Sequence, residues 1–177
     1  MKVDAIFHLA DIHIRILTRH NEYRSAYKKL FDKAKEINDK YKNPICVIAG
    51  DIVHAKIDMS PELIQMITEL MEGLSNILPV YVYPGNHDAN LNNANRMDAL
   101  EPILTSISKY SNLRYIKDDE VIRFDNMKLY HMSVFDEVEN YVDGSKLDNN
   151  TLNFVVYHGA VNDAFTDKNY RLSNDRI

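Results

Sequence analysis

The sequence predicts an α/β fold built on a parallel sheet, with polar groups at the carboxyl ends of its strands. Three short apolar runs, Val3 to Leu9, Pro44 to Ala49 and Val80 to Tyr83, alternate with two segments of helical periodicity. The runs are largely apolar and do not alternate with polar residues, which is typical of parallel strands buried on both faces. Each run leads into a loop that carries Asp, Asn or His, and such loops meet at one edge of a parallel sheet.

Length and composition indicate one globular domain. The chain has 177 residues, of which 45% are hydrophobic, and a net charge of −5. This charge does not favour nucleic acid as a partner, but bound divalent cations would neutralise acidic groups locally, so DNA is not excluded. The single cysteine, Cys46, lies in an apolar run and is interpreted as a buried thiol. No run of about 20 apolar residues and no signal-peptide core is present, so we expect an intracellular protein without membrane contact.

The first predicted strand, Val3 to Leu9, leads to Asp11 and His13. In an extended chain two residues at this spacing point to the same face, as two ligands of one metal ion must. His8, within the strand, is interpreted as a hydrogen-bonded core histidine.

Three helices are predicted from apolar stripes at helical spacing. Asn21-Glu22 can cap the first, which runs to about Tyr41. Ser60-Pro61 is a strong start for the second, with a capping hydroxyl followed by proline at the first helical position. The third, 98–108, follows an Asn-rich loop at 90–95.

The second and third strands end as the first one does. Pro44 to Ala49 runs into Gly50-Asp51, and Val80 to Tyr83 runs into Gly85-Asn86-His87-Asp88. Gly85 is expected to supply a turn conformation that side chains forbid. Polar residues therefore emerge together at a third strand end.

The pattern changes after residue 112, because no helix separates the strands that follow. Leu113 to Ile116, Glu120 to Phe124 and Lys128 to Met132 read as an antiparallel meander, which suggests a second sheet packed behind the first. After an irregular polar stretch, a final buried strand, Leu152 to Tyr157, ends at His158.

Six residues at these strand ends form the candidate site. Oxygen and nitrogen ligands without thiolate suit Mn²⁺, Fe, Zn²⁺ or Mg²⁺, and a shared carboxylate, here Asp51, can hold two ions about 3.5 to 4 Å apart. Two such ions activate water and hold a phosphate for in-line attack, so phosphoester hydrolysis is expected. The leaving group needs a proton, for which His87 is the candidate acid. The six residues are Asp11, His13, Asp51, Asn86, His87 and His158.

The motifs Asp11-x-His13, Gly50-Asp51, Gly85-Asn86-His87-Asp88 and Tyr157-His158-Gly159 resemble those of the calcineurin-like metallophosphoesterase superfamily. Within it, the segments 8–13 and 50–54 are similar to those of SbcD-like DNA-repair nucleases, which pair with an SbcC-like coiled-coil ABC ATPase. The resemblance implies an αββα sandwich and a Mn²⁺-dependent DNA nuclease, acting as exonuclease and single-strand endonuclease in double-strand-break repair. DNA and the ATPase are the implied partners.

The resemblance also implies individual roles. His87 would contact the phosphate as the acid, Asp88 would orient His87 through a hydrogen bond, and His54 would support the ligands or face DNA. One Mn²⁺ would lie among Asp11, His13 and Asp51, and the other among Asp51, Asn86 and His158.

One departure from the family pattern affects these expectations. The superfamily closes its site with a Gly-His-x-His segment that the sequence to Ile177 does not contain, and no histidine follows His158. Residues 1–177 would thus form one metallophosphoesterase domain, incomplete at its C-terminus and truncated in the second sheet. We favour a fragment of a longer nuclease over a naturally short relative with impaired metal binding. Its exposed edge would favour self-association, including a homodimer.

Two other functions remain open at this level. A phosphodiesterase or phosphatase for small nucleotides would use the same chemistry. A metal-poor scaffold would keep the fold without catalysis.

Overall fold

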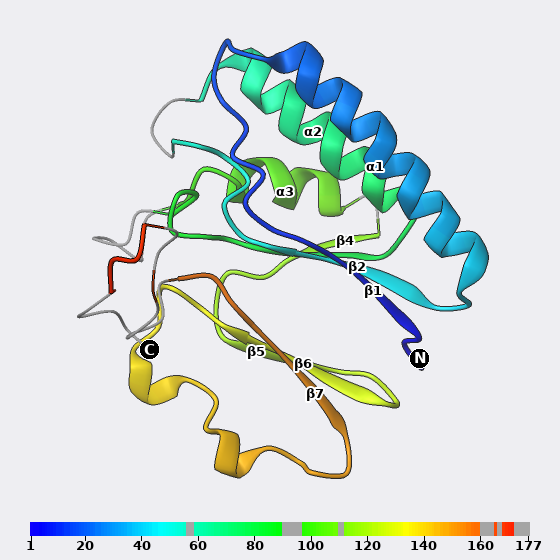
Figure 1. Cartoon of the computed structure of the whole chain (residues 1–177), viewed down its shortest axis with the longest axis vertical. Coiled ribbons are helices and arrows are strands. Elements are labelled where there is room, and N and C mark those ends of the chain that lie inside the picture. The colour runs from blue at the N-terminus through cyan, green and yellow to red at the C-terminus, as the bar shows by residue number, and fades with distance from the viewer. Residues whose placement is uncertain (56–58, 90–96, 110–111, 160–164, 166–167, 172–177) are drawn as a thin grey trace.

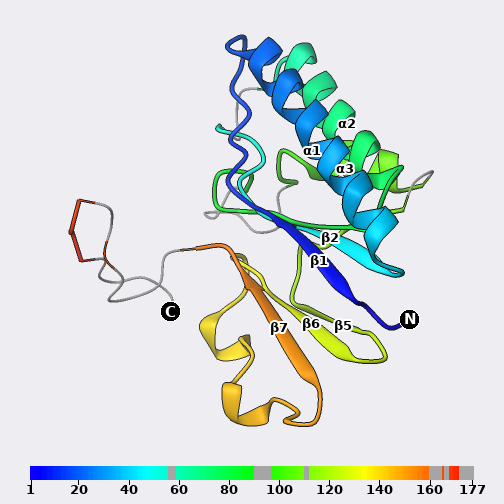
Figure 2. The same ribbon diagram turned by 45° about the vertical axis from the view of Figure 1, so that its right-hand side comes forward.

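A computed structural model shows three layers, in which helices cover one face of a parallel sheet and a second sheet covers the other (Figures 1 and 2). The structure describes residues 1–55, 59–89, 97–109, 112–159, 165 and 168–171. The predicted Asn-rich loop, 90–95, lies outside these residues. The α/β prediction with two stacked sheets is confirmed. Of the two helical layers of an αββα sandwich, the described residues contain the one over the first sheet.

The first sheet has four parallel strands in the order β1-β2-β3-β4. Its three predicted strands are confirmed, and the central one, β2, is buried along its whole length. The expectation that Leu113 to Ile116 begins the second sheet is wrong, because β4 pairs with β3 in parallel, with Leu113 opposite Val80. Helix α3 makes the crossover between them. The strands are β1 (Ala5–Leu9), β2 (Pro44–Ala49), β3 (Val80–Tyr83) and β4 (Leu113–Tyr115).

The three helices are α1 (His20–Lys40), α2 (Pro61–Ser75) and α3 (Glu101–Ser108). In α2 the predicted cap is present, since the Ser60 hydroxyl accepts a hydrogen bond from the Leu63 N–H at 3.2 Å.

The other two helices begin differently from the prediction. The expected Asn21-Glu22 cap of α1 is wrong, because the capping position is Arg19, in a left-handed conformation, and its guanidinium binds the Glu22 carboxylate. Helix α3 begins later than residue 98, because the Asp98 carboxylate accepts hydrogen bonds from the N–H groups of Leu100 and Glu101, both at 2.8 Å.

The second sheet, in the order β5-β6-β7, is mixed. Its first pair is antiparallel as predicted, but β7 runs parallel to β6. The prediction that β7 is buried is wrong in part, because Leu152 is 62% and Val155 41% exposed. β7 is an edge strand, so one side has no neighbour in the described sheet. The strands are β5 (Glu120–Arg123), β6 (Met127–Met132) and β7 (Leu152–Tyr157).

Strand β2 contributes to two hydrophobic cores because its side chains alternate between the faces of the first sheet. Cys46 and Ile48 pack under the helices, and Val47 packs against the second sheet. Burial raises the pKa of the Cys46 thiol to about 12, as expected for an unreactive thiol. The apolar composition of β2 thus follows from its burial on both faces.

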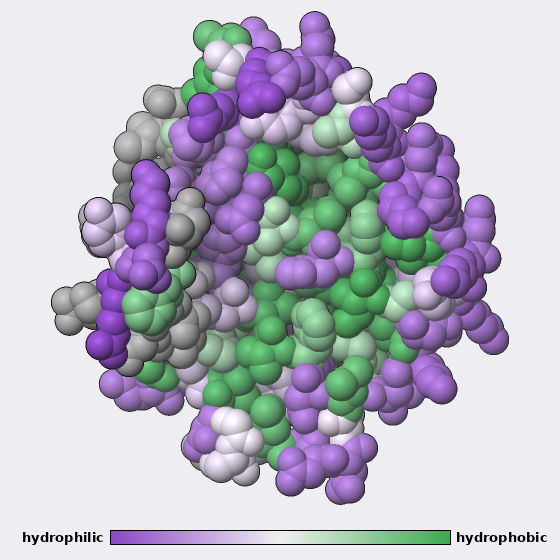
Figure 3. Space-filling model, in the orientation of Figure 1, coloured by the Kyte–Doolittle hydropathy of each residue, from purple (hydrophilic) through white to green (hydrophobic). Residues whose placement is uncertain are grey.

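The edge strands β1 and β7 lie on the same side of the molecule, and apolar residues form a band across this face (Figure 3). Phe7 of β1 and Phe154 of β7 are only partly buried. No helix in the described part of the chain is long and apolar enough to cross a membrane.

Candidate metal centre

The loops that follow β1, β2, β3 and β7 converge on an open cavity of about 630 Å³. As predicted for parallel strands, their polar residues meet at the carboxyl edge of the first sheet. All six predicted site residues line this cavity: Asp11, His13, Asp51, Asn86, His87 and His158.

Three of these residues have strained backbones. Asp11, His13 and Asp51 have φ angles of 55°, 48° and 54°, in the left-handed region that costs a residue with a side chain about 1 to 3 kcal/mol. Hydrogen bonds from the Asp11 N–H to the Gly50 carbonyl (3.2 Å) and from the His13 N–H to the Asp51 carbonyl (2.9 Å) hold the two loops together. Nε2 of His13 lies 3.6 Å from Oδ1 of Asp11, so the two side chains meet, but the extended-chain reason for this is wrong, since β1 ends at Leu9 and both residues have left-handed backbones.

Two glycines allow the loops to pack closely around Asp51. A Cβ on Gly50, whose φ is 83°, would lie 2.6 Å from Cγ of His158, and one on Gly85 would lie 2.2 Å from Oδ1 of Asp51. Among the described glycines only Gly50 has a positive φ. The expectation that Gly85 adopts a conformation forbidden to other residues is therefore wrong. A side chain at this position is excluded because it would collide with Asp51.

The Asp51 carboxylate lies at the centre of the site and is 5% exposed. Its Oδ2 is 3.5 Å from Nε2 of His13, 3.2 Å from Nε2 of His158 and 4.0 Å from Nε2 of His87. Burial raises the pKa of Asp51, but hydrogen bonds from His158 and the backbone N–H of His87 outweigh this effect, so the pKa lies below its usual value. The pKa of His158 is raised: burial opposes this shift, but the hydrogen bond to Asp51 and the Asp51 charge prevail.

These residues fit a divalent cation. One candidate ligand atom from each of Asp11, Asp51 and His158 lies within 4.8 Å of the others. A nearly buried carboxylate faced by three imidazoles is a hard-to-borderline donor set of the kind that Mn²⁺, Fe and Zn²⁺ accept. Asn86 lines the same cavity and supplies an amide. The position of Asp51 fits its predicted role as the shared ligand.

Asp88 has a different role from the one expected. Its carboxylate is fully buried and accepts hydrogen bonds from the N–H groups of Ile52 (3.2 Å), Val53 (2.9 Å) and Gly85 (2.9 Å). The predicted hydrogen bond from Asp88 to His87 is therefore wrong. Burial raises the pKa of Asp88 to about 6, although the three N–H donors oppose this shift. Asp88 ties the loop after β2 to the loop after β3.

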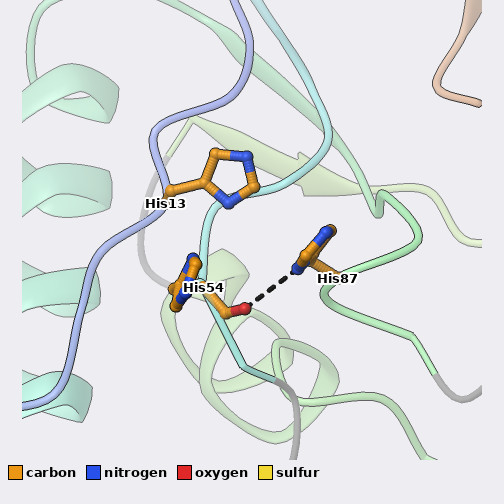
Figure 4. Close-up of side chains that lie close together, drawn as sticks. All are labelled: His13, His54 and His87. Carbon is orange, nitrogen blue, oxygen red and sulfur yellow. Dashed lines mark hydrogen bonds between the residues drawn. The ribbon is translucent and has the colours of Figure 1, made fainter. Parts of the chain in front are cut away.

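The backbone of His54 orients His87 instead. Nδ1 of His87 lies 2.9 Å from the His54 carbonyl oxygen (Figure 4). Because a carbonyl only accepts, this nitrogen carries the proton and Nε2 is left toward the cavity. Loss of hydration and the Arg15 charge lower the pKa of the His54 imidazole. A contact made by a backbone carbonyl leaves no side-chain signal in the sequence.

Sequence reasoning also missed His8. It is exposed and lines the cavity, with its ring edge-to-face on Phe154 at 6.4 Å between centroids. The interpretation as a core histidine is wrong because β1 is an edge strand. The exposure of His8 depends on the order of the strands in the sheet, which the residues of β1 alone do not reveal.

A model of the calcineurin-like phosphoesterase family matches residues 5–176. The chain belongs to this family. The predicted superfamily is thereby confirmed, and membership implies metal-dependent phosphoester hydrolysis, in agreement with the cavity's ligand set. The narrower SbcD-like assignment stays a prediction.

A relative of this phosphoesterase occurs in Acanthamoeba polyphaga mimivirus, where it is named uncharacterized protein R555. The two are 37% identical over 186 residues, which include 99% of this chain. The chain spans 14% of the length of that relative.

Proposed function

We propose that this calcineurin-like phosphoesterase hydrolyses DNA phosphodiesters with Mn²⁺ as its metal, as the nuclease part of a DNA-repair complex. The observation that carries the proposal is the placement of His87. Its side chain is 43% exposed, its Nε2 lies 4.0 Å from the central Asp51 carboxylate, and its Nδ1 is held by the His54 carbonyl. This is the placement required of an acid that meets a phosphate next to the metal site.

The metal would be held by the carboxylates, the amide and the imidazoles that face Asp51. When bound, the ions supply the Lewis acidity that activates water and neutralises charge on a phosphate. Mn²⁺ accepts such a mixture of oxygen and nitrogen ligands. The residues concerned are Asp11, His13, Asp51, Asn86 and His158.

The need for an acid favours DNA over activated esters as the substrate. Cleavage of DNA releases a deoxyribose alkoxide, which is a poor leaving group unless it gains a proton. A protonated His87 can donate from Nε2 while Nδ1–H stays on the His54 carbonyl. The cavity is open, which is compatible with a polymer lying across it.

The proposal extends to the partners that the resemblance implies. DNA would be the substrate, and an SbcC-like coiled-coil ABC ATPase would be the partner protein. The exposed apolar residues along β7 favour association of two copies.

The test compares two substrates in the presence of Mn²⁺. We expect His87→Gln to lower cleavage of a single-stranded oligonucleotide by about 10²- to 10⁴-fold, which is the usual contribution of a general acid. Hydrolysis of bis-p-nitrophenyl phosphate should fall far less, because nitrophenolate leaves without a proton. His20→Gln is the matched control, since His20 bonds the Arg15 carbonyl outside the cavity.

Three outcomes would contradict the proposal. Equal losses of activity on both substrates would show that His87 is not the acid. Turnover of small nucleotides without cleavage of DNA would favour the small-nucleotide phosphodiesterase. Calorimetry that shows no Mn²⁺ binding below millimolar concentration would favour the scaffold.

A further inference from the structure

Three histidines form a second cluster beside the carboxylate-rich site. His13, His54 and His87 come from three different loops and face a common space (Figure 4). One candidate ligand nitrogen from each lies within 4.8 Å of the other two. The ring centroids are 5.0 Å apart for His13 and His87, 5.7 Å for His13 and His54, and 6.0 Å for His54 and His87.

The backbone holds this cluster together without a ligand. The N–H of His54 donates to the Ile14 carbonyl (3.1 Å), and Ile14 pairs with Val53 in an isolated parallel bridge, so the loops bearing His13 and His54 run side by side. The buried Asp88 carboxylate ties the His54 loop to the His87 loop. A site preorganised in this way loses little conformational entropy when it binds a ligand.

The nitrogens of this cluster are available to a metal. Nδ1 of His87 donates to a backbone carbonyl, which is the usual second hydrogen bond of a metal-ligating histidine and leaves Nε2 as the donor to the metal. Nδ1 of His13 is buried and has no hydrogen-bond partner among the residues that the structure describes. An unpartnered buried polar atom is costly unless something binds it.

We propose that His13, His54 and His87 form a second metal site, for Zn²⁺, beside the site centred on Asp51 and with His13 common to both. Three neutral imidazoles suit Zn²⁺ and its neighbours Cu²⁺ and Ni²⁺, whereas Mn²⁺ and Mg²⁺ prefer carboxylate oxygens. With Zn–N bonds of about 2.0 to 2.1 Å, two ligand nitrogens of a tetrahedral ion lie roughly 3.4 Å apart. Modest ring rotations would bring nitrogens within 4.8 Å to that spacing.

Occupancy of this site has a consequence that rests on the proposed function. Zn²⁺ bound to Nε2 of His87 takes the electron pair that a proton must occupy if His87 is to serve as the acid. Zn²⁺ would therefore inhibit DNA cleavage.

The binding test measures Zn²⁺ and Mn²⁺ affinity by calorimetry, together with the visible absorption of Co²⁺ as a stand-in for Zn²⁺. We expect His54→Ala to weaken Zn²⁺ binding by at least about 10- to 100-fold and to change the Co²⁺ spectrum, with Mn²⁺ affinity within about twofold of wild type. Asp11→Asn should do the reverse, weakening Mn²⁺ while Zn²⁺ binding persists. His20→Gln should change neither affinity.

Two results would overturn the site. One is unchanged Zn²⁺ affinity in His54→Ala with the fold intact by circular dichroism. The other is loss of Zn²⁺ binding in Asp11→Asn, which would place Zn²⁺ among the carboxylates. If the chain binds Zn²⁺ as expected but cleaves no DNA, the proposed function fails while the binding site stands.

Discussion

The two sheets differ in how well they are covered, and the candidate site is divided unequally between them. Strand β2 of the first sheet is buried along its whole length, whereas β7 of the second sheet leaves Leu152 and Val155 exposed. Five of the six site residues follow strands of the first sheet, and only His158 follows a strand of the second.

This difference indicates which parts of the site are rigid by themselves. The loops of the first sheet are tied together by the buried Asp88 and by backbone hydrogen bonds. His158 reaches the first sheet through its contacts with Asp51 and the Ala49 carbonyl. The first sheet therefore sets the geometry of the site, and the second completes it through one imidazole.

The largest expected effect is the loss of the buried tie in the first sheet. Asp88→Ala would leave three backbone N–H groups without their acceptor, and we expect the free energy of unfolding to fall by roughly 3 to 5 kcal/mol. Urea unfolding measures this loss. Asp125→Ala is the control, because Asp125 is exposed and pairs only with the amino terminus in the described contacts, which is worth less than about 1 kcal/mol. Similar losses of unfolding free energy in both variants would show that Asp88 does not hold the loops after β2 and β3 together.

The second expected effect concerns a histidine buried in the second sheet. His131 on β6 is 5% exposed, and its ring packs on Tyr83 of the first sheet with centroids 4.4 Å apart. Burial lowers its pKa from 6.5 to about 4, although the Asp118 carbonyl and the charges of Asp118 and Asp136 oppose this shift. The unfolded chain therefore binds a proton between these pH values that the folded chain does not.

The stability that His131 contributes is thus present above about pH 6.5 and is lost as the pH falls toward 4, by roughly 3 kcal/mol. His131→Phe keeps a ring on Tyr83 and removes the titration, so its unfolding free energy should fall less than that of wild type over this range. The raised pKa values of Asp88 and Asp119 act in the opposite sense but are common to both proteins. Parallel pH profiles would contradict the assignment.

The parts predicted well from the sequence are those set by local patterns. The bounds of β2 and β3 agree with the apolar runs, and the Ser60-Pro61 start of α2 is confirmed, because burial and capping depend on neighbouring residues. The convergence of the five site residues that follow β1, β2 and β3 also follows from one rule of parallel sheets.

The parts that failed depend on contacts distant in sequence. Pairing of β4 with β3, and the exposure of His8, are decided by strand order, which short segments do not encode. The left-handed backbones of Asp11 and Asp51 are stabilised by neighbouring loops. The role of Asp88 could not be predicted from the sequence either. Its carboxylate oxygens accept hydrogen bonds from backbone N–H groups, which leave no signal in the sequence.

The third expected effect tests the junction between the sheets. Asp51→Asn removes the charge that faces three imidazoles, so we expect Mn²⁺ affinity to fall by about 100-fold or more. His158→Gln removes only the contribution of the second sheet and should cost about 10-fold. Calorimetric Mn²⁺ titration measures both. If His158→Gln loses more Mn²⁺ affinity than Asp51→Asn, the claim that the first sheet sets the geometry of the site is wrong.

The smallest expected effect compares the two sheets directly with one isosteric substitution. Val47 lies in the middle of β2 with no exposed surface, and Val155 lies in β7 with 41% exposed. Val47→Thr buries a hydroxyl in a packed core and should lower the free energy of unfolding by about 1 to 3 kcal/mol, whereas Val155→Thr should change it by less than about 0.5 kcal/mol. Both values come from urea unfolding at the same pH. A loss of unfolding free energy in Val155→Thr as large as that in Val47→Thr would mean that the outer face of β7 is covered in solution, for instance by a second copy of the chain. The difference in burial between the two sheets would then hold only for the isolated chain.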